Sequence, residues 1–148
     1  MRWTRGEAQI EALLAARELQ RVAAADGTAW LDRAHRTLAT AGEIGADDPE
    51  SAFVLAYDAA RHACTGLLVH QGLRPTSGGG HYVVERALRA QFGEPFRPFA
   101  ALRRRRNELE YPAFPGELVD AAEVEAALAT AHALLGAAAR LLPEVGTF

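Results

Sequence analysis

The sequence predicts an all-α protein, an antiparallel up-and-down bundle of about five to six helices. The composition is rich in Ala, Leu, Arg and Glu and poor in β-branched residues. Apolar residues recur at helical spacing, and residues that start or stop helices separate these stretches. We find no internal repeat and no convincing strand. The whole chain, 1–148, is predicted to be one domain with a helical core at about 7–142.

The first predicted helix covers about 7–25 and ends before Gly27, because glycine readily takes the backbone conformation that terminates a helix. Thr28 is the cap of the second helix, since its hydroxyl can accept a hydrogen bond from a free backbone N–H. This second helix ends near Gly45.

The third and longest helix, at about 49–71, has an N-terminal signature: Asp48 as the cap and Pro49 at the first helical position. Gly72 ends it. A glycine-rich loop then leads into the fourth helix, at about 81–92.

The fifth helix begins after a turn with two prolines and covers 98–110. Pro112 ends it, because the residue before a proline is pushed away from helical geometry. Asp120 and Glu123 form a capping-box pattern, which predicts a last helix over 121–142.

Composition and charge exclude several classes of function. The net charge is −3 and lysine is absent, so a contact with nucleic acid must come from local arginine clusters. The single cysteine, Cys64, excludes intramolecular disulfides and a multi-thiolate zinc site. The histidines lack ligand spacing, and we expect no metal and no cofactor. Without a signal peptide or a bilayer-length apolar run, the chain is expected to be cytoplasmic and not membrane-bound.

The most informative segment is the arginine run 103–106. Phe99, Leu102, Arg106 and Leu109 share one stripe of the fifth helix, with Glu110 beside them. A guanidinium on a core-facing stripe is costly unless it is paired or lines a cleft that binds anions. Two interpretations therefore stand: a structural pair with Glu110, or a phosphate site.

Neighbouring residues extend the phosphate hypothesis. Arg104 and Arg105 would add attraction for a polyanion. Tyr111 lies where the helix must unwind, so its hydroxyl can turn back toward Arg106.

The segment from Arg106 to Tyr111 resembles the R-x4-H motif of the HEPN superfamily (higher eukaryotes and prokaryotes nucleotide-binding), in which an Arg and a polar residue precede a His. The stretch 57–61, Tyr-Asp-Ala-Ala-Arg, resembles this group as well. The resemblance implies a helical bundle that forms a homodimer with two motifs facing each other. It also implies a metal-independent ribonuclease or toxin-like component, with a nucleotidyltransferase-type antitoxin as partner.

Residue by residue, the resemblance implies that Arg106 holds the phosphate and Asn107 is the polar positioner. Tyr111 stands where the family has its histidine. A phenol with an ordinary pKa of about 10 can donate a hydrogen bond or a proton, but it is a poor base at neutral pH.

His81 is the second candidate, because it begins a helix after three glycines, where free N–H groups favour an anion. Arg74 and Ser77 are candidate contributors to that anion site. If the fourth helix packs beside the fifth, His81 can approach Arg106 and replace the missing imidazole. The alternative is a flexible connection with an exposed cap residue.

On the third helix, Tyr57 and Asp58 are candidates for orienting Arg106 from a neighbouring element, as Glu110 is from its own helix. The structural alternative is that Asp58 pairs with Arg61 or His62 along the helix.

Three functions follow from these observations. The first is an RNA-directed protein, an endoribonuclease or toxin-like component, with Arg106, Asn107, Tyr111 and His81 in the site. The second is a catalytically inactive HEPN-like module that binds a nucleotide or a partner protein. The third is a bundle whose Arg106–Glu110 pair is only structural.

Overall fold

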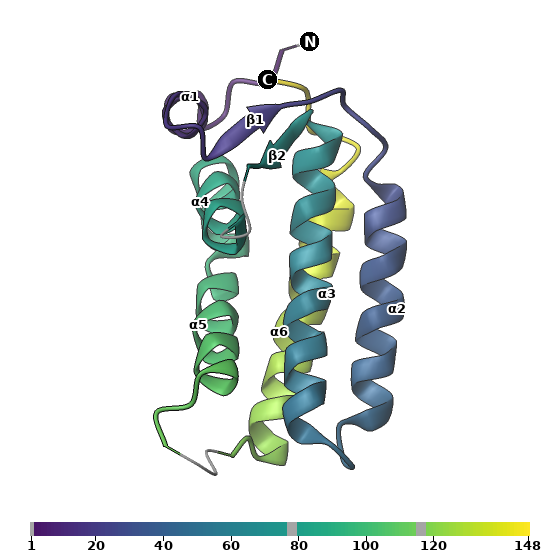
Figure 1. Ribbon diagram of the computed structural model, residues 1–148. Coiled ribbons are helices and arrows are strands. Elements are labelled where there is room, and N and C mark those ends of the chain that lie inside the picture. Colours follow the sequence, from purple (N-terminus) through teal and green to yellow (C-terminus); the bar gives the residue numbers. More distant parts are fainter. Residues whose placement is uncertain (1, 77–79, 115–117) are drawn as a thin grey trace.

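Three long helices, α2 (Thr28–Ile44), α3 (Pro49–His70) and α6 (Ala121–Leu141), form the centre of the fold. The computed structural model describes residues 2–76, 80–114 and 118–148. Helix α3 packs against both α2 and α6, which also contact each other, and all three follow the long axis of the molecule (Figure 1). The prediction of an all-α bundle is confirmed.

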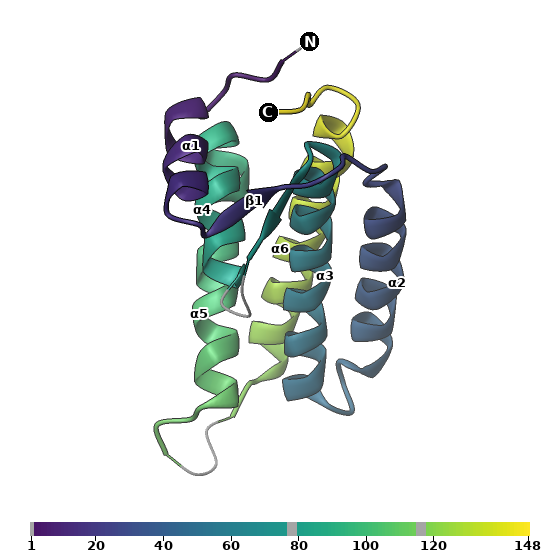
Figure 2. The ribbon, with the colours of Figure 1, turned by 45° about the horizontal axis from the view of Figure 1, so that its top comes forward.

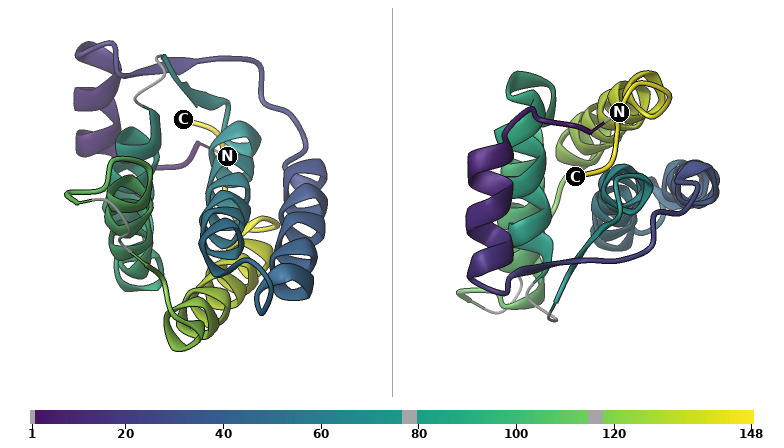
Figure 3. Two further views of the ribbon diagram at one scale, coloured as in Figure 1. Left: turned by 60° about the horizontal axis from the view of Figure 1, so that its bottom comes forward. Right: turned by 90° about the horizontal axis from the view of Figure 1, so that it is seen from above.

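A second layer covers the other side of α3. Helices α4 (Gly80–Phe92) and α5 (Pro98–Glu110) follow one another there, joined by the 3-10 turn η1 (Glu94–Phe96), and both contact α3. Helix α1 (Glu7–Ala15) lies along α4, as the view from above shows (Figure 3). In Figure 1 α1 is seen end-on, so it crosses the long central helices steeply.

The predicted capping residues act as expected at two helix starts. The Asp48 carboxylate accepts a hydrogen bond from the Ser51 backbone N–H at 3.2 Å, with Pro49 at the first helical position of α3. The Asp120 carboxylate accepts from the Glu123 N–H at 2.8 Å at the start of α6. Local capping therefore sets these boundaries, and the predicted bounds of α5 are confirmed.

The prediction of one helix over 7–25 is wrong beyond Ala15. There the Ala16 N–H still bonds to the Ala12 carbonyl, but Arg17 adopts a left-handed backbone with φ 59°. Few non-glycine residues take this conformation. The sequence has no glycine or proline at this point that would have predicted the turn.

The residues after this turn form a strand, contrary to the prediction of none. Strand β1 (Leu19–Arg21) pairs antiparallel with β2 (Leu73–Pro75), with Leu19 opposite Pro75. The two strands lie between α1 and the upper end of α3 (Figure 2). Leu19 is buried. The pairing joins segments more than fifty residues apart, which local periodicity cannot reveal.

The hydrophobic core lies around α3, which contributes buried residues on most of its circumference. Its largest fully buried aromatic side chains are those of Tyr57, Phe96 and Phe99. Tyr57 and Phe99 stack with ring centroids 5.5 Å apart, which ties α3 to α5. Within the described ranges, none of the helices combines the length and apolarity needed to cross a membrane.

A buried amide pair joins the end of α3 to α4. Gln71 and Gln91 exchange two side-chain hydrogen bonds of 2.6 and 3.0 Å, and the Trp3 indole N–H donates to the Gln91 oxygen at 2.8 Å. Both glutamines are under 5% exposed. This network ties the N-terminal segment to the helical layers.

Replacing Gln91 by alanine is therefore expected to lower the free energy of unfolding by about 2 kcal/mol, because the Gln71 amide loses its buried partners. Urea denaturation of the two proteins measures the difference. Gln9→Ala, at an exposed position of α1, is the matched control and should stay within about 0.5 kcal/mol of the wild type. Equal stability of Gln91→Ala and the wild type would contradict a structural role for the pair.

Candidate functional site

Arg106 faces inward from α5, as its stripe predicts. Phe99, Leu102 and Leu109 on the same stripe are buried, and the Arg106 side chain is 19% exposed. One terminal nitrogen lies 2.6 Å from the Glu110 carboxylate. Its Nε is buried and has no hydrogen-bond partner among the described residues. Over the described part of the chain, the guanidinium thus has one ion pair and one unused buried donor, and the side chain is partly open to solvent.

The inner wall of this site is the ring of Tyr57, which is fully buried on α3. The Arg106 guanidinium carbon lies 5.9 Å from the centroid of that ring, at the outer limit of a cation–π contact. Phe99 stacks on the ring as well. Burial raises the pKa of the Tyr57 hydroxyl well above its ordinary value. Tyr57 is therefore a neutral phenol at physiological pH.

His81, at the start of α4, meets the same tyrosine. Its Nδ1 lies 2.8 Å from the Tyr57 hydroxyl, and the two ring centroids are 5.5 Å apart. Burial lowers the pKa of His81, and the positive charges of Arg61 and Arg106 lower it further. The imidazole is therefore mostly neutral at pH 7. Tyr57 thus contacts both His81 and Arg106. The sequence alone could not show whether these two residues lie near each other.

The hydrogen bond between Tyr57 and His81 permits two arrangements of protons. Either the phenol donates to Nδ1 and Nε2 carries the imidazole proton, or Nδ1–H donates to the phenol oxygen and Nε2 keeps a free lone pair. In the second arrangement Nε2 can act as a base. Because the phenol can serve as donor or acceptor, the pair can hold either form.

Asp58 and Arg61 continue the site along α3. They lie 3.8 Å apart and are each 28% exposed. The Nε of Arg61 is buried and, in the described part of the chain, has no hydrogen-bond partner. Asp58 thus pairs with Arg61, which is the structural role considered for it from the sequence. Its negative charge also raises the pKa of His81 and so partly offsets the lowering by burial and by the arginines. Arg61 adds a second guanidinium with an unused donor to the site.

Arg103 and Glu85 form a largely buried ion pair near Tyr57 and Arg106. Arg103 Nε donates to the Glu85 carboxylate at 2.8 Å, and the two side chains are 17% and 5% exposed. Glu85 also lies 3.7 Å from Arg89 on its own helix. A carboxylate so deeply buried needs such partners. Glu85 therefore fixes the position of Arg103 on the edge of the site.

The other arginines of the run point elsewhere. Arg105 donates to Glu123 on α6 at 2.5 Å and to Glu108 at 3.0 Å, which ties α5 to α6. Arg104 is exposed and lines a different surface, with Arg89 and Arg97. The arginines predicted to help Arg106 thus do not gather around it.

The remaining motif residues lie at the solvent-exposed end of α5. Asn107 is exposed, and its carbonyl accepts the Tyr111 N–H at 2.9 Å. Tyr111 caps the helix with a side chain 79% exposed. Its ring extends into solvent, and the tyrosine that contacts Arg106 is Tyr57.

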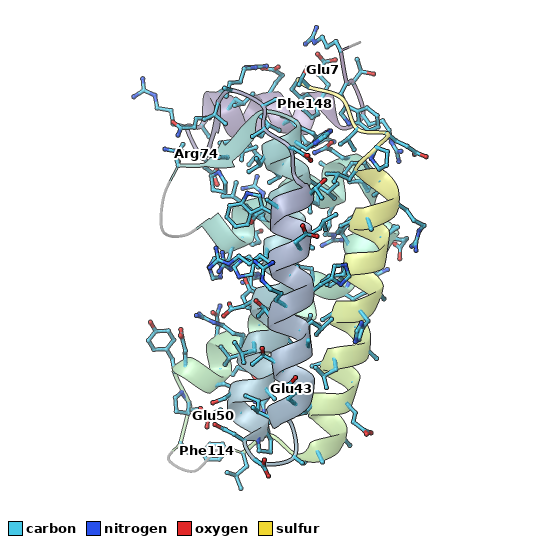
Figure 4. The ribbon with its side chains drawn as sticks, turned by 90° about the vertical axis from the view of Figure 1, so that its right-hand side faces the viewer. Glu7, Glu43, Glu50, Arg74, Phe114 and Phe148 are labelled. Atoms are coloured by element: carbon cyan, nitrogen blue, oxygen red, sulfur yellow. The ribbon has the colours of Figure 1, made fainter. Side chains whose placement is uncertain are left out.

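Of the two residues predicted to assist His81, Arg74 lies away from the cluster. Arg74 is exposed on β2 opposite Gln20, near the end of the molecule away from Phe114, which follows α5 (Figure 4). Ser77 lies outside the described residues.

The sequence did not single out Arg61, Arg103 or Glu85 as members of the site. A signal existed for Arg61, because it lies four residues after Tyr57 and so on the same face of α3. The role of Glu85 depends on α4 facing α5, which no local pattern reveals.

Comparison with known proteins found no match to a protein family, to a curated protein or to a solved structure. Over the described ranges, no three His, Cys, Asp or Glu side chains are grouped so that they could hold a metal ion.

Proposed function

We propose that the cluster of Arg106, Tyr57 and His81 binds a phosphate of RNA and cleaves the chain without a metal ion, as the HEPN resemblance implies. The observation that supports this most directly is the double contact of Tyr57, with the Arg106 guanidinium over its ring and His81 on its hydroxyl. A phosphate ligand and a neutral imidazole are the two groups that cleavage by a neighbouring 2′-hydroxyl requires.

In the proposed reaction, Nε2 of His81 takes the proton of a ribose 2′-hydroxyl. The 2′-oxygen attacks the adjacent phosphorus, the bond from phosphorus to the 5′-oxygen breaks, and the imidazolium returns its proton to that oxygen. The products are a 2′,3′-cyclic phosphate and a 5′-hydroxyl. Arg106 stabilises the charge that develops on the phosphate oxygens, and Tyr57 accepts Nδ1–H and so leaves Nε2 free.

Incubation of the purified protein with single-stranded RNA in the presence of EDTA tests this proposal. We expect cyclic-phosphate products, and we expect His81→Ala to lower the cleavage rate about 100-fold, because it removes the base. His132→Ala, an exposed histidine on α6, is the control and should cleave like the wild type. The absence of cleavage by the wild type, or equal cleavage by His81→Ala, would overturn the catalytic assignment.

The pH dependence of cleavage is a second check on His81. Only the neutral imidazole can act as base, and the pKa of His81 lies below its ordinary value of 6.5. The rate should therefore fall as the pH drops through that lowered pKa and stay level between about pH 6.5 and 8. Arg61→Ala removes a positive charge that lowers this pKa, so the acid limb should move to higher pH. An unmoved limb would contradict the assignment of the limb to His81.

A specific observation favours the catalytically inactive module as a second candidate. The Glu110 carboxylate lies 2.6 Å from the Arg106 guanidinium, where it competes with a phosphate. A protein that binds RNA or a nucleotide through Arg106 but leaves RNA intact would support this candidate. The homodimer and the nucleotidyltransferase-type partner that the resemblance implies stay predictions.

A further inference from the structure

A hollow lies on the outer side of α4, away from the candidate site. It is an open pocket of about 420 Å³ between α1, α4 and the turn into α5. Figure 2 shows α1 and α4 side by side at this place. The proposed cleavage chemistry does not use this pocket.

Arginines outnumber acids in the lining of this pocket, where Glu85 and Glu94 are the acids. Arg86, Arg89 and Arg97 line it. A neighbouring pocket of about 500 Å³ shares Arg89 and Arg97 and adds Arg104. We call the two together the arginine groove, which continues from α4 onto α5. Arg104, predicted from the sequence to contact phosphate, belongs to this groove.

Three arginines of the groove have acidic partners: Arg89 lies 3.7 Å from the buried Glu85, while the partners of Arg97 and Arg86 are exposed. Arg97 pairs with Glu94 at 3.4 Å, and the two side chains are 67% and 82% exposed. Arg86 pairs with Glu18 at 3.3 Å, also at the surface. Exposed ion pairs of this kind contribute little free energy, so a phosphate can replace the carboxylate at small cost.

Tyr82 connects the groove to the candidate site. It follows His81 in α4, and successive helical residues point about 100° apart, so His81 turns toward Tyr57 while Tyr82 lines the groove. Its ring is 50% exposed. The guanidinium carbons of Arg103 and Arg86 lie 5.1 and 5.5 Å from the ring centroid. An exposed aromatic ring among arginines is the combination on which single-stranded nucleic acids stack.

We propose that the arginine groove binds the nucleotides next to the phosphate held at Arg106, with Tyr82 and its arginine neighbours stacking on a base. Arg89, Arg97 and Arg104 contact the flanking phosphates. The assignment of these nucleotides as neighbours of a cleaved phosphate rests on the proposed function. The occupant is single-stranded RNA, because an acidic protein segment would need the arginines but not the exposed ring.

Binding of a fluorescent ten-nucleotide RNA with 2′-O-methyl groups, which cannot be cleaved, tests the groove. We expect Tyr82→Ala to weaken binding about 10-fold and Tyr82→Phe to retain it, because the ring and not the hydroxyl stacks. The double variant Arg97→Ala/Arg104→Ala should reduce the salt slope of log K by about 1.4, since each lost phosphate contact removes about 0.7. Arg36→Ala, an exposed arginine on α2, is the control for charge.

The outcomes separate this proposal from the function on which it rests. If Tyr82→Ala and the double arginine variant weaken RNA binding but the wild type does not cleave RNA, the groove is supported and the enzyme is refuted. RNA cleavage combined with wild-type binding by Tyr82→Ala and by the double arginine variant would overturn the groove and leave the enzyme standing. If a poly-glutamate peptide binds as tightly as the RNA, and Tyr82→Ala does not weaken its binding, the RNA groove is overturned in favour of a site for an acidic protein partner.

Discussion

Arg106→Ala is expected to lower RNA cleavage about 1000-fold, the largest effect of any single substitution in this protein. In the proposed reaction the guanidinium stabilises charge on the phosphate in the transition state, and loss of one such donor typically costs 100- to 1000-fold. The Arg106 side chain is 19% exposed, so part of the guanidinium can be reached from solvent. Single-turnover cleavage of a short RNA measures the effect. Arg36→Ala is the control for loss of a positive charge.

Arg106→Lys separates two-point recognition from charge alone. An ammonium keeps the charge but cannot present two parallel N–H donors to a phosphate. We therefore expect Arg106→Lys to recover only a small part of the activity. Full activity of the lysine variant would show that charge alone suffices.

Glu110→Gln distinguishes the anion site from a purely structural pair. If the Arg106–Glu110 pair only stabilises α5, Glu110→Gln and Arg106→Ala should lower the free energy of unfolding by similar small amounts, about 0–1 kcal/mol as for other partly exposed pairs. If Arg106 binds phosphate, removing the competing carboxylate should strengthen RNA binding while Arg106→Ala weakens it. Weaker RNA binding by Glu110→Gln would contradict the competition.

Gly27→Ala is expected to lower the free energy of unfolding by about 3 kcal/mol, the largest effect on stability. A Cβ at Gly27 would lie 2.4 Å from the Gly66 carbonyl oxygen and 2.8 Å from Leu142 Cδ1. The Gly27 backbone, with φ −72°, suits alanine, so the cost is steric. The backbones at the start of α2 and within α3 would have to separate. Thermal unfolding should show a fall in Tm of roughly 10 °C.

Gly42→Ala is the matched control on the same helix. Nothing lies within 4 Å of a Cβ at this exposed position, so only the helical preference of alanine acts. The variant should gain up to about 1 kcal/mol. Wild-type stability of Gly27→Ala would mean that α2 and α3 can separate without loss, which would contradict the close packing of the two helices.

Much of the fold was predictable because its signals are local. Asp48 and Asp120 mark helix starts through hydrogen bonds to residues within one turn, and Pro49 through its fixed backbone angle. The inward position of Arg106 follows from its spacing to Leu102 and Leu109. The end of α1 was not predictable, because Arg17 takes a conformation that its side chain does not signal and β1 needs a distant partner.

The candidate site was likewise predictable only in part. Arg106, His81 and Tyr57 are recognisable one by one from charge, position and helical spacing, since each depends on its own segment. Their meeting depends on how α3, α4 and α5 pack, and that packing selects Tyr57 rather than Tyr111 as the partner of Arg106. Side-chain chemistry is a property of the local chain, whereas proximity between segments arises only when the core excludes water from all of them together.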